Sequence, residues 1–90
     1  MSTFEELVAE IFNDIGAMLS KKHHDYGDHN LDEFGLIGIT VRLRDKTARL
    51  KSLIMEKKEG EVSDETINDT LMDIAGYAIQ GLRMRKEETK

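Results

Sequence analysis

Apolar residues recur at helical spacing along most of the chain. The first set follows steps of three and four residues: Phe4, Leu7, Val8, Ile11, Phe12, Ile15, Met18 and Leu19. Such a stripe is typical of one buried face of an α-helix. Two overlapping capping boxes precede it, Ser2 with Glu5 and Thr3 with Glu6, and they predict where the helix begins. We therefore expect a helix over residues 3–21 whose stripe belongs to the core.

Two further helices are predicted after a polar, turn-rich stretch at residues 22–35, which we expect to be a long loop. The second helix, from Leu36 to about Lys57, has apolar residues spaced like a and d positions: Leu36, Ile39, Leu43, Leu50 and Ile54. Gly60 ends this segment and Ser63 is the expected N-cap of the third helix. The expected core stripe of the third helix is Ile67, Leu71, Ile74, Ala78 and Leu82. Residues 84–90 are charged and are expected to fray.

These elements predict an all-α fold, a small bundle of three main helices in a single domain over residues 1–90. A chain of 90 residues buries limited apolar surface, so we expect the bundle to be completed by oligomerisation as a dimer or tetramer. No apolar run is long enough to span a bilayer, and the N-terminus is unlike a targeting peptide. The sequence therefore predicts a cytoplasmic protein without a membrane partner.

Composition excludes several kinds of site. The chain has no cysteine, so neither disulfides nor a thiolate metal site are available. Its formal net charge of −5 argues against direct nucleic-acid binding, which usually requires a basic face. The histidines of KKHHDYGDH lack the spacing of a zinc site. We also find no glycine-rich phosphate loop and no nucleophile elbow.

The predicted third helix carries an acidic row, Glu65, Asp69 and Asp73, whose successive members are four positions apart. Like charges at this spacing repel by about 0.2–0.5 kcal/mol per pair. Two or three such carboxylates can converge on a hard cation, since Mg²⁺ takes one or two carboxylates together with substrate phosphates. The row could equally face solvent, or pair with arginines of another helix.

Those arginines are available on the second predicted helix, where VRLRDKTARL brings together Arg42, Asp45, Lys46 and Arg49. Arg42, Asp45 and Arg49 are expected on the side opposite the apolar stripe. A guanidinium group suits a phosphate or a carboxylate equally well. This basic group could therefore neutralise the acidic row or hold the anionic ligand of a metal bound there.

Four motifs resemble a known family. They are Lys-x-x-x-Asp-Tyr-Gly at Lys21–Gly27, Phe-Gly-x-x-Gly at Phe34–Gly38, Val-Arg-x-x-Asp-Lys-x-x-Arg-Leu at Val41–Leu50 and Asp-Thr-x-x-Asp-Ile-x-x-Tyr at Asp69–Tyr77. Over about residues 21–80 the chain resembles nucleotide modification associated domain 1, a small family often found in phages and prophages. Before Lys21 the resemblance is limited to amphipathic character.

That family is in turn similar to the all-α nucleoside triphosphate pyrophosphohydrolases of the MazG and dimeric dUTPase kind. The resemblance implies a Mg²⁺-dependent, or Mn²⁺-dependent, cleavage of a nucleoside triphosphate to a monophosphate and pyrophosphate. The implied metal ligands are Glu65, Asp69 and Asp73, with Asp45, Asp69 and Asp73 as catalytic residues. The implied nucleotide-binding residues are Lys22, Tyr26, Arg42, Lys46 and Arg49. A phage-encoded member would work in the host cytoplasm.

Two alternative functions are also considered, and a difference between this chain and those enzymes motivates the first. Where the enzymes have several glutamates on their second helix, this chain has Arg42, Arg44, Asp45, Lys46 and Arg49. A non-catalytic protein that binds or sequesters a nucleotide, for example one used in host defence signalling, is therefore the second hypothesis. The third is an interaction domain in which the acidic and basic helices pair only with each other.

Overall fold

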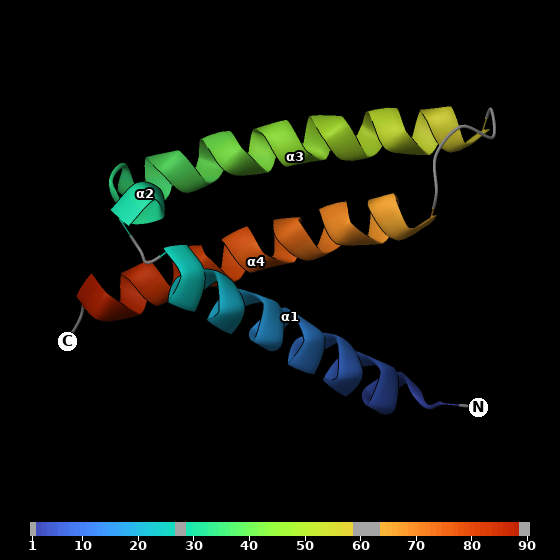
Figure 1. Ribbon diagram of the computed structural model, residues 1–90, viewed down its shortest axis with the longest axis horizontal. Helices are drawn as coiled ribbons and strands as arrows, with labels where there is room; N and C mark the ends of the chain where they lie inside the picture. Colours follow the sequence, from blue (N-terminus) through green and yellow to red (C-terminus); the bar gives the residue numbers. More distant parts are fainter. Residues whose placement is uncertain (1, 27–28, 59–63, 89–90) are drawn as a thin grey trace. The chain divides into compact units, whose positions relative to one another are not determined.

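The computed structural model describes residues 2–26, 29–58 and 64–88, which form helices joined by short segments (Figure 1). The helices are α1 (Phe4–Tyr26), α2 (His29–Asp32), α3 (Gly35–Lys58) and α4 (Asp64–Glu88). No strand occurs in these ranges, so the prediction of an all-α fold is confirmed. The chain divides into two units, Met1–Asn30 and Leu31–Lys90, and each is described by itself.

The first unit is built on α1, and its start agrees with one of the two predicted capping boxes. The backbone N–H of Glu6 donates to Thr3 Oγ1 at 3.1 Å, and Thr3 Oγ1 donates to Glu6 Oε1 at 3.0 Å. The N–H of Leu7 donates to the Thr3 carbonyl at 3.0 Å. Thr3, and not Ser2, is therefore the residue that caps this helix.

The predicted loop at residues 22–35 is wrong for most of its length. The helix continues to Tyr26, and His29–Asp32 form a further single turn. Lys21 and Asp25 form an ion pair at 3.2 Å across one turn of the extension, which favours helix modestly. The polar residues 22–26 are compatible with a helix because they include no helix breaker; the first is Gly27.

The apolar stripe of α1 is only partly covered. Ile15 is buried, whereas Phe4, Leu7, Ile11 and Phe12 are exposed. The expectation that the whole stripe belongs to the core is therefore wrong for its N-terminal half. A unit that contains one long helix has no second helix of its own to cover both ends of a stripe.

The second unit is built on an antiparallel pair, with α3 and α4 side by side (Figure 1). The observed bounds of α3 agree with the predicted helix at residues 36–57. Gly35 starts the helix with a φ of 57°, a left-handed conformation that costs glycine little. α4 begins at Asp64 and includes residues 84–88, while the predicted stop Gly60 and N-cap Ser63 lie outside the described residues. That the tail frays in solution stays a prediction.

The core of this pair differs from the predicted stripes. On α3, Ile39 is 4% exposed and Leu53, which was not predicted, is 7% exposed, while Ile54 is 48% exposed and wrongly predicted. On α4, the buried residues include Thr70, Gly81 and Met84. Three residues of the predicted α4 stripe, Leu71, Ala78 and Leu82, are exposed, so the core-facing side of α4 is rotated toward Asp73.

A glycine and a hydrogen-bonded threonine on α4 explain this rotation. A Cβ placed on Gly81 would lie 3.6 Å from Leu36 Cδ2 and 3.7 Å from Ile39 Cγ2, so the two helices approach closely at this glycine. Thr70 is buried without an unpaired hydroxyl, because its Oγ1 donates to the Thr66 carbonyl at 2.9 Å. Burying a satisfied hydroxyl costs far less than burying a free one.

Gly81→Ala is expected to stabilise the protein by about 0.5–1 kcal/mol. Alanine removes the penalty of a glycine inside a helix, and its Cβ would make ordinary van der Waals contacts with Leu36 and Ile39. Chemical denaturation should show a higher midpoint for Gly81→Ala and a lower one for Gly81→Leu, whose larger side chain does not fit. A lower midpoint for both would contradict this packing.

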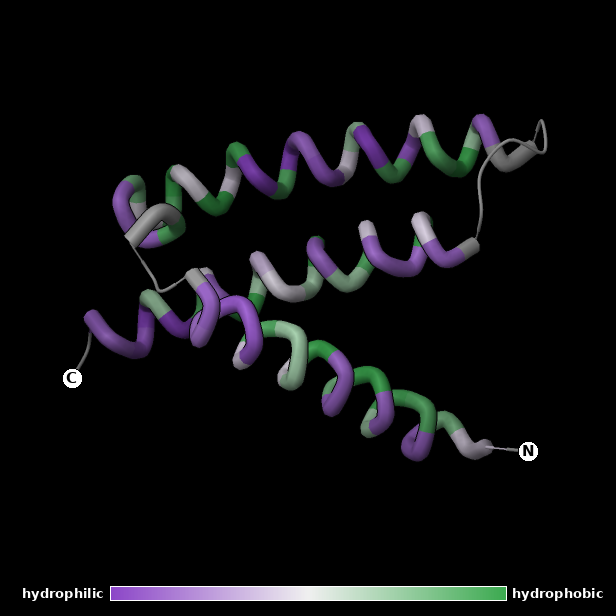
Figure 2. The backbone as a smooth tube through the Cα atoms, viewed as in Figure 1, coloured by the Kyte–Doolittle hydropathy of each residue, from purple (hydrophilic) through white to green (hydrophobic). Residues whose placement is uncertain are grey.

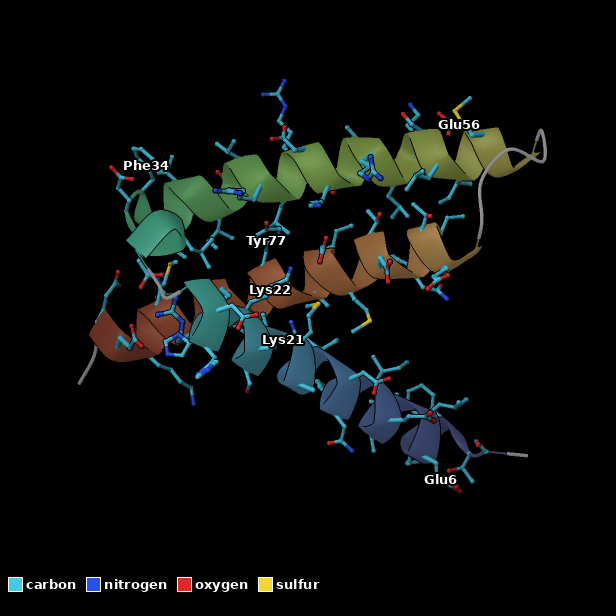
Figure 3. The ribbon with its side chains drawn as sticks, in the orientation of Figure 1. Glu6, Lys21, Lys22, Phe34, Glu56 and Tyr77 are labelled. Atoms are coloured by element: carbon cyan, nitrogen blue, oxygen red, sulfur yellow. The ribbon has the colours of Figure 1, made fainter. Side chains whose placement is uncertain are left out.

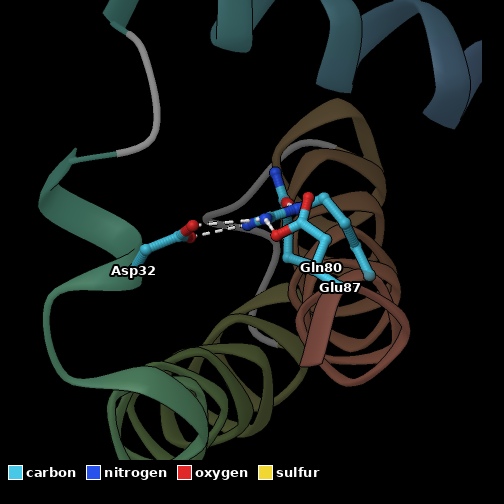
Figure 4. A network of polar contacts seen from close by, with 4 residues as sticks. Asp32, Gln80 and Glu87 are labelled. Carbon is cyan, nitrogen blue, oxygen red and sulfur yellow. Dashed lines mark hydrogen bonds and ion pairs between the residues drawn. The ribbon is translucent and has the colours of Figure 1, made fainter. Parts of the chain in front are cut away.

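Arg83 ties α2 to α4 (Figure 4). Its Nη2 lies 2.6 Å from Asp32 Oδ1 and its Nη1 lies 3.2 Å from Asp32 Oδ2, a bidentate contact between residues 51 positions apart. Gln80 accepts from Nε at 2.6 Å and Glu87 accepts from Nη1 at 2.9 Å. The hydrogen bond to Asp32 raises the pKa of Arg83 above its ordinary value. This contact was not predicted from the sequence.

Arg83→Lys is expected to lower the melting temperature by a few degrees, because an ammonium group cannot form the bidentate contact with Asp32. Both partners are partly exposed, so the loss should be about 1 kcal/mol or less. The exposed Arg85 is the matched control, and Arg85→Lys should leave the melting temperature unchanged. Equal effects in both variants would show that the Asp32 contact contributes nothing specific.

Candidate functional site

The centre of the candidate site is an ion pair between α3 and α4. Lys46 Nζ lies 3.0 Å from Asp73 Oδ2, and the two side chains are 30% and 23% exposed. Lys46 follows Ile39 and Leu43 and precedes Leu50 and Leu53 at steps of three and four residues. It therefore occupies a core-facing position of α3, where the other members of the series are apolar.

A lysine at such a position requires a partner for its charge. Its aliphatic stem can lie against apolar neighbours while the ammonium group reaches the edge of the interface. An ammonium group that loses water without gaining a partner is costly, and Asp73 supplies that partner. One member of the acidic row is thus paired with the basic group of α3. Pairing between these two helices was one of the alternatives that the sequence left open.

Arg42 and Arg49 flank this pair. They lie one turn before and one turn after Lys46 on α3, and both are exposed. In an antiparallel pair that brings Lys46 to Asp73, Arg49 comes to the level of Asp69, and Arg42 to the level of Tyr77. Helical spacing puts these residues on the same side of the helix pair, where the exposed guanidinium groups adjoin the Lys46–Asp73 contact.

Tyr77 is a further residue of the candidate site, and its side-chain chemistry alone did not identify it. It is half-buried one turn after Asp73, and it projects from α4 into the space between α4 and α3 (Figure 3). The signal for it in the sequence is the motif that joins Asp69, Thr70, Asp73 and Tyr77, in which it is the final residue.

The predicted acids do not gather into one cluster. Asp45, Glu65 and Asp69 are exposed on their helices. Within the described residues no group of three or more histidine and acidic side chains is placed to hold a metal ion. Asp69 and Asp73 remain one helical turn apart, so the protein offers two neighbouring carboxylates, one of which already contacts Lys46.

Lys22 and Tyr26 were predicted to contact a nucleotide from a loop, but both belong to the last turns of α1. Lys22 is exposed, and the side chain of Tyr26 lies outside the described residues. Their proposed contact with a ligand stays a prediction.

A comparison with protein-family models identifies the relatives of this chain. The model described as nucleotide modification associated domain 1 matches residues 22–83 of the 90. The chain belongs to this family. The matched range of this nucleotide modification associated domain contains all of α3 and the part of α4 that holds Asp69, Asp73 and Tyr77. No curated protein and no solved structure matches the chain.

The site of this nucleotide modification associated domain has a defined chemical character. Helical spacing places three cationic side chains and two carboxylates along one edge of the α3–α4 pair. Lys46 and Asp73, nearest the centre of this edge, form an ion pair. Such an edge can bind an anion through the guanidinium groups. In the described part of the domain, no helix is both long and apolar enough to cross a membrane.

Proposed function

We propose that this domain binds the phosphates of a nucleotide along the edge formed by Arg42, Lys46 and Arg49, and hydrolyses a nucleoside triphosphate with Mg²⁺. The products would be a nucleoside monophosphate and pyrophosphate, in the nucleotide metabolism of a phage or prophage. The observation that carries the proposal is the partly buried Lys46–Asp73 pair, placed in the helices that the family model matches.

The carboxylates present fit a magnesium ion in number and type. Asp69 and Asp73 lie one turn apart, and Mg²⁺ commonly takes one or two protein carboxylates while phosphate oxygens and water complete its coordination. Glu65, one turn before Asp69, would assist, and Mn²⁺ would serve as a substitute. When bound, the ion supplies polarisation of the phosphate and a more acidic attacking water.

The contact with Lys46 has a direct consequence for this chemistry. In the protein alone, the ammonium group of Lys46 balances the charge of Asp73. A cation held by Asp73 would repel that ammonium group, which would then turn toward the phosphates. Arg42 and Arg49 would stabilise the charge that develops on the phosphate oxygens during cleavage. Lys46 thereby couples metal binding to phosphate binding.

The same ion pair also favours a second candidate function. Since Lys46 already pairs with Asp73, the charge of that carboxylate is balanced without a metal. A domain that binds or sequesters a nucleotide without cleaving it would use the three cationic side chains and need no divalent ion. In either case we propose that the protein acts as a homo-oligomer in the cytoplasm, which would be the host cytoplasm for a phage-encoded member.

A panel of nucleotides tests both proposals. Nucleoside and deoxynucleoside mono-, di- and triphosphates are incubated with the protein in Mg²⁺, in Mn²⁺ and in EDTA, and pyrophosphate release and melting temperature are recorded. Release that requires the divalent ion supports the hydrolase. A shift in melting temperature that persists in EDTA without product supports the binding protein. No response to any nucleotide or ion would overturn both proposals and favour a purely structural pairing of the helices.

A further inference from the structure

The side of α3 that faces away from α4 has an apolar stripe of its own. Ile37 is 72% exposed, Val41 is 53% exposed and Met55 is 59% exposed, with Ala48 exposed between them. Just before the helix, Phe34 is 69% exposed and projects from the turn that follows α2 (Figure 3). The core on the α4 side does not account for these residues, and hydrophobic positions recur along the whole of α3 in Figure 2.

These residues have the spacing of a helix-pairing surface. Steps of four and three residues connect the members of what we call the outer stripe: Ile37, Val41, Arg44, Ala48, Lys51 and Met55. At about 100° per residue, Ile37 and Val41 lie on either side of the direction opposite Ile39. Alternating steps of three and four residues are the signature of a and d positions in paired helices.

We propose that the outer stripes of two copies of this chain pair antiparallel, with a two-fold axis at the level of Lys46. In this register Ile37 lies opposite Met55 of the second copy. Val41 lies opposite Lys51 of the second copy, and Arg44 lies opposite Ala48 of the second copy. Each of these three residue pairs forms one layer of the interface, in which an a position lies opposite a d position. The two-fold axis generates a second, equivalent copy of each layer.

The charged members of the stripe determine the orientation. A parallel pairing would set Arg44 against Arg44 and Lys51 against Lys51, which are repulsive contacts in a surface that loses water. The antiparallel pairing sets each cation against a smaller or branched aliphatic residue. Ala48 leaves room for the long side chain of Arg44, and Val41 packs on the aliphatic stem of Lys51.

Charge is also balanced at the axis. Asp45 follows Arg44 directly and lies beside the stripe, so Arg44 of one copy lies within about one helical turn of the level of Asp45 of the second copy. Two guanidinium groups and two carboxylates then meet with no net charge. The stripe is self-complementary in size and in charge, which is why a second copy of this chain is the occupant it fits.

The association state of the full chain tests the pairing, using sedimentation velocity over a concentration series. The wild type is expected to dimerise. Ala48→Arg adds a cation opposite Arg44 in both layers and is expected to raise the dimer dissociation constant by about tenfold or more. Ala48→Glu, which is similar in size but opposite in charge, should dimerise at least as well as the wild type.

A second pair of variants separates the interface from misfolding. Arg44→Glu combined with Ala48→Arg restores opposite charges in the layer and should restore the dimer. Ala78→Arg makes the same change at an exposed position of α4 and should leave dimerisation unchanged. A monomeric wild type at every concentration, or a dimer unaffected by Ala48→Arg, would overturn the proposal.

Orientation is tested by crosslinking, because the chain contains no cysteine. A mixture of Ile37→Cys and Met55→Cys should form a disulfide between the two variants under mild oxidation, while Ile37→Cys alone should not crosslink. Crosslinking of Ile37→Cys alone would show a parallel pairing. None of these measurements involves a nucleotide, so this proposal fails independently of the proposed nucleotide binding and hydrolysis. It rests on the proposed function only for the homo-oligomer, which a monomeric wild type would also overturn.

Discussion

Asp73→Asn is expected to lower pyrophosphate release from the preferred nucleoside triphosphate by about a hundredfold if the domain is a Mg²⁺-dependent hydrolase. The substitution keeps the size of the side chain and removes the charge that would hold the cation. Mutation of even an outer-shell partner of a metal ligand typically costs about 10- to 100-fold in activity, so the loss of a ligand's charge should cost at least the upper end of that range. Initial rates at saturating Mg²⁺ would show the effect. Activity equal to that of the wild type would contradict the proposed mechanism.

The same variant gives the opposite result if the domain only binds a nucleotide. Asp73 is then a competitor for Lys46, whose ammonium group it contacts at 3.0 Å. Removing its charge should free Lys46 for the phosphates and tighten nucleotide binding several-fold in EDTA. Isothermal titration calorimetry in EDTA therefore separates the two functions by the sign of the change.

Two further variants control for structural damage. Lys46→Met keeps an unbranched side chain but removes the cation, so it should weaken nucleotide binding under either function. Asp69→Asn removes a charge from an exposed position and should lower only a metal-dependent activity. If the pair is purely structural, Asp73→Asn and Lys46→Met should each cost about 1 kcal/mol in stability and leave nucleotide binding unaltered.

The sequence predicted the helices of the second unit well because their signals are local. The apolar spacing of α3 and the absence of proline are properties of short segments, and the observed bounds differ from the predicted ones by single residues at α3. The Thr3–Glu6 capping box is equally local and is confirmed. The prediction failed at residues 22–26 because polar composition does not by itself distinguish a loop from an exposed helix, and these residues include no helix breaker.

The faces of the helices were harder to predict. On α4 the apolar residues are spread widely around the helix, so their spacing did not determine which side meets α3. The structure buries Thr70 and Gly81 there and leaves Leu71 and Leu82 exposed. Two properties determine which side of α4 meets α3. The helices approach closely at a glycine, and the buried threonine hydroxyl forms a hydrogen bond within its own helix. A hydrophobicity pattern indicates neither property.

The candidate site was predicted in part. The basic and acidic groups were recognised, and the structure joins them through Lys46 and Asp73. Lys46 was grouped with polar residues, although its spacing from Leu43 and Leu50 matches a core position. Asp45 and Glu65 were predicted to share a metal with Asp69 and Asp73, and the described residues hold no such cluster. A cluster of that kind depends on the rotation of each helix, which spacing alone does not determine.

Ile39→Ala is expected to destabilise the protein by about 3 kcal/mol, the largest stability effect that we predict. Ile39 is 4% exposed and its Cγ1 and Cγ2 atoms lie against the glycine at position 81, so truncation leaves a cavity between α3 and α4. Truncating a buried isoleucine to alanine costs about 2–5 kcal/mol. Urea denaturation followed by circular dichroism, at one fixed protein concentration, would measure the loss.

Ile54→Ala is the matched control, because it makes the same chemical change on the same helix. Hydrophobic spacing predicted the same buried role for both isoleucines, but Ile54 is 48% exposed. Its truncation should therefore cost less than about 1 kcal/mol, in proportion to the smaller area that it buries. Equal losses at the two positions would show that α3 is rotated in solution toward the face that spacing alone suggests. A loss confined to Ile39 would support the observed rotation, and with it the placement of Lys46 against Asp73.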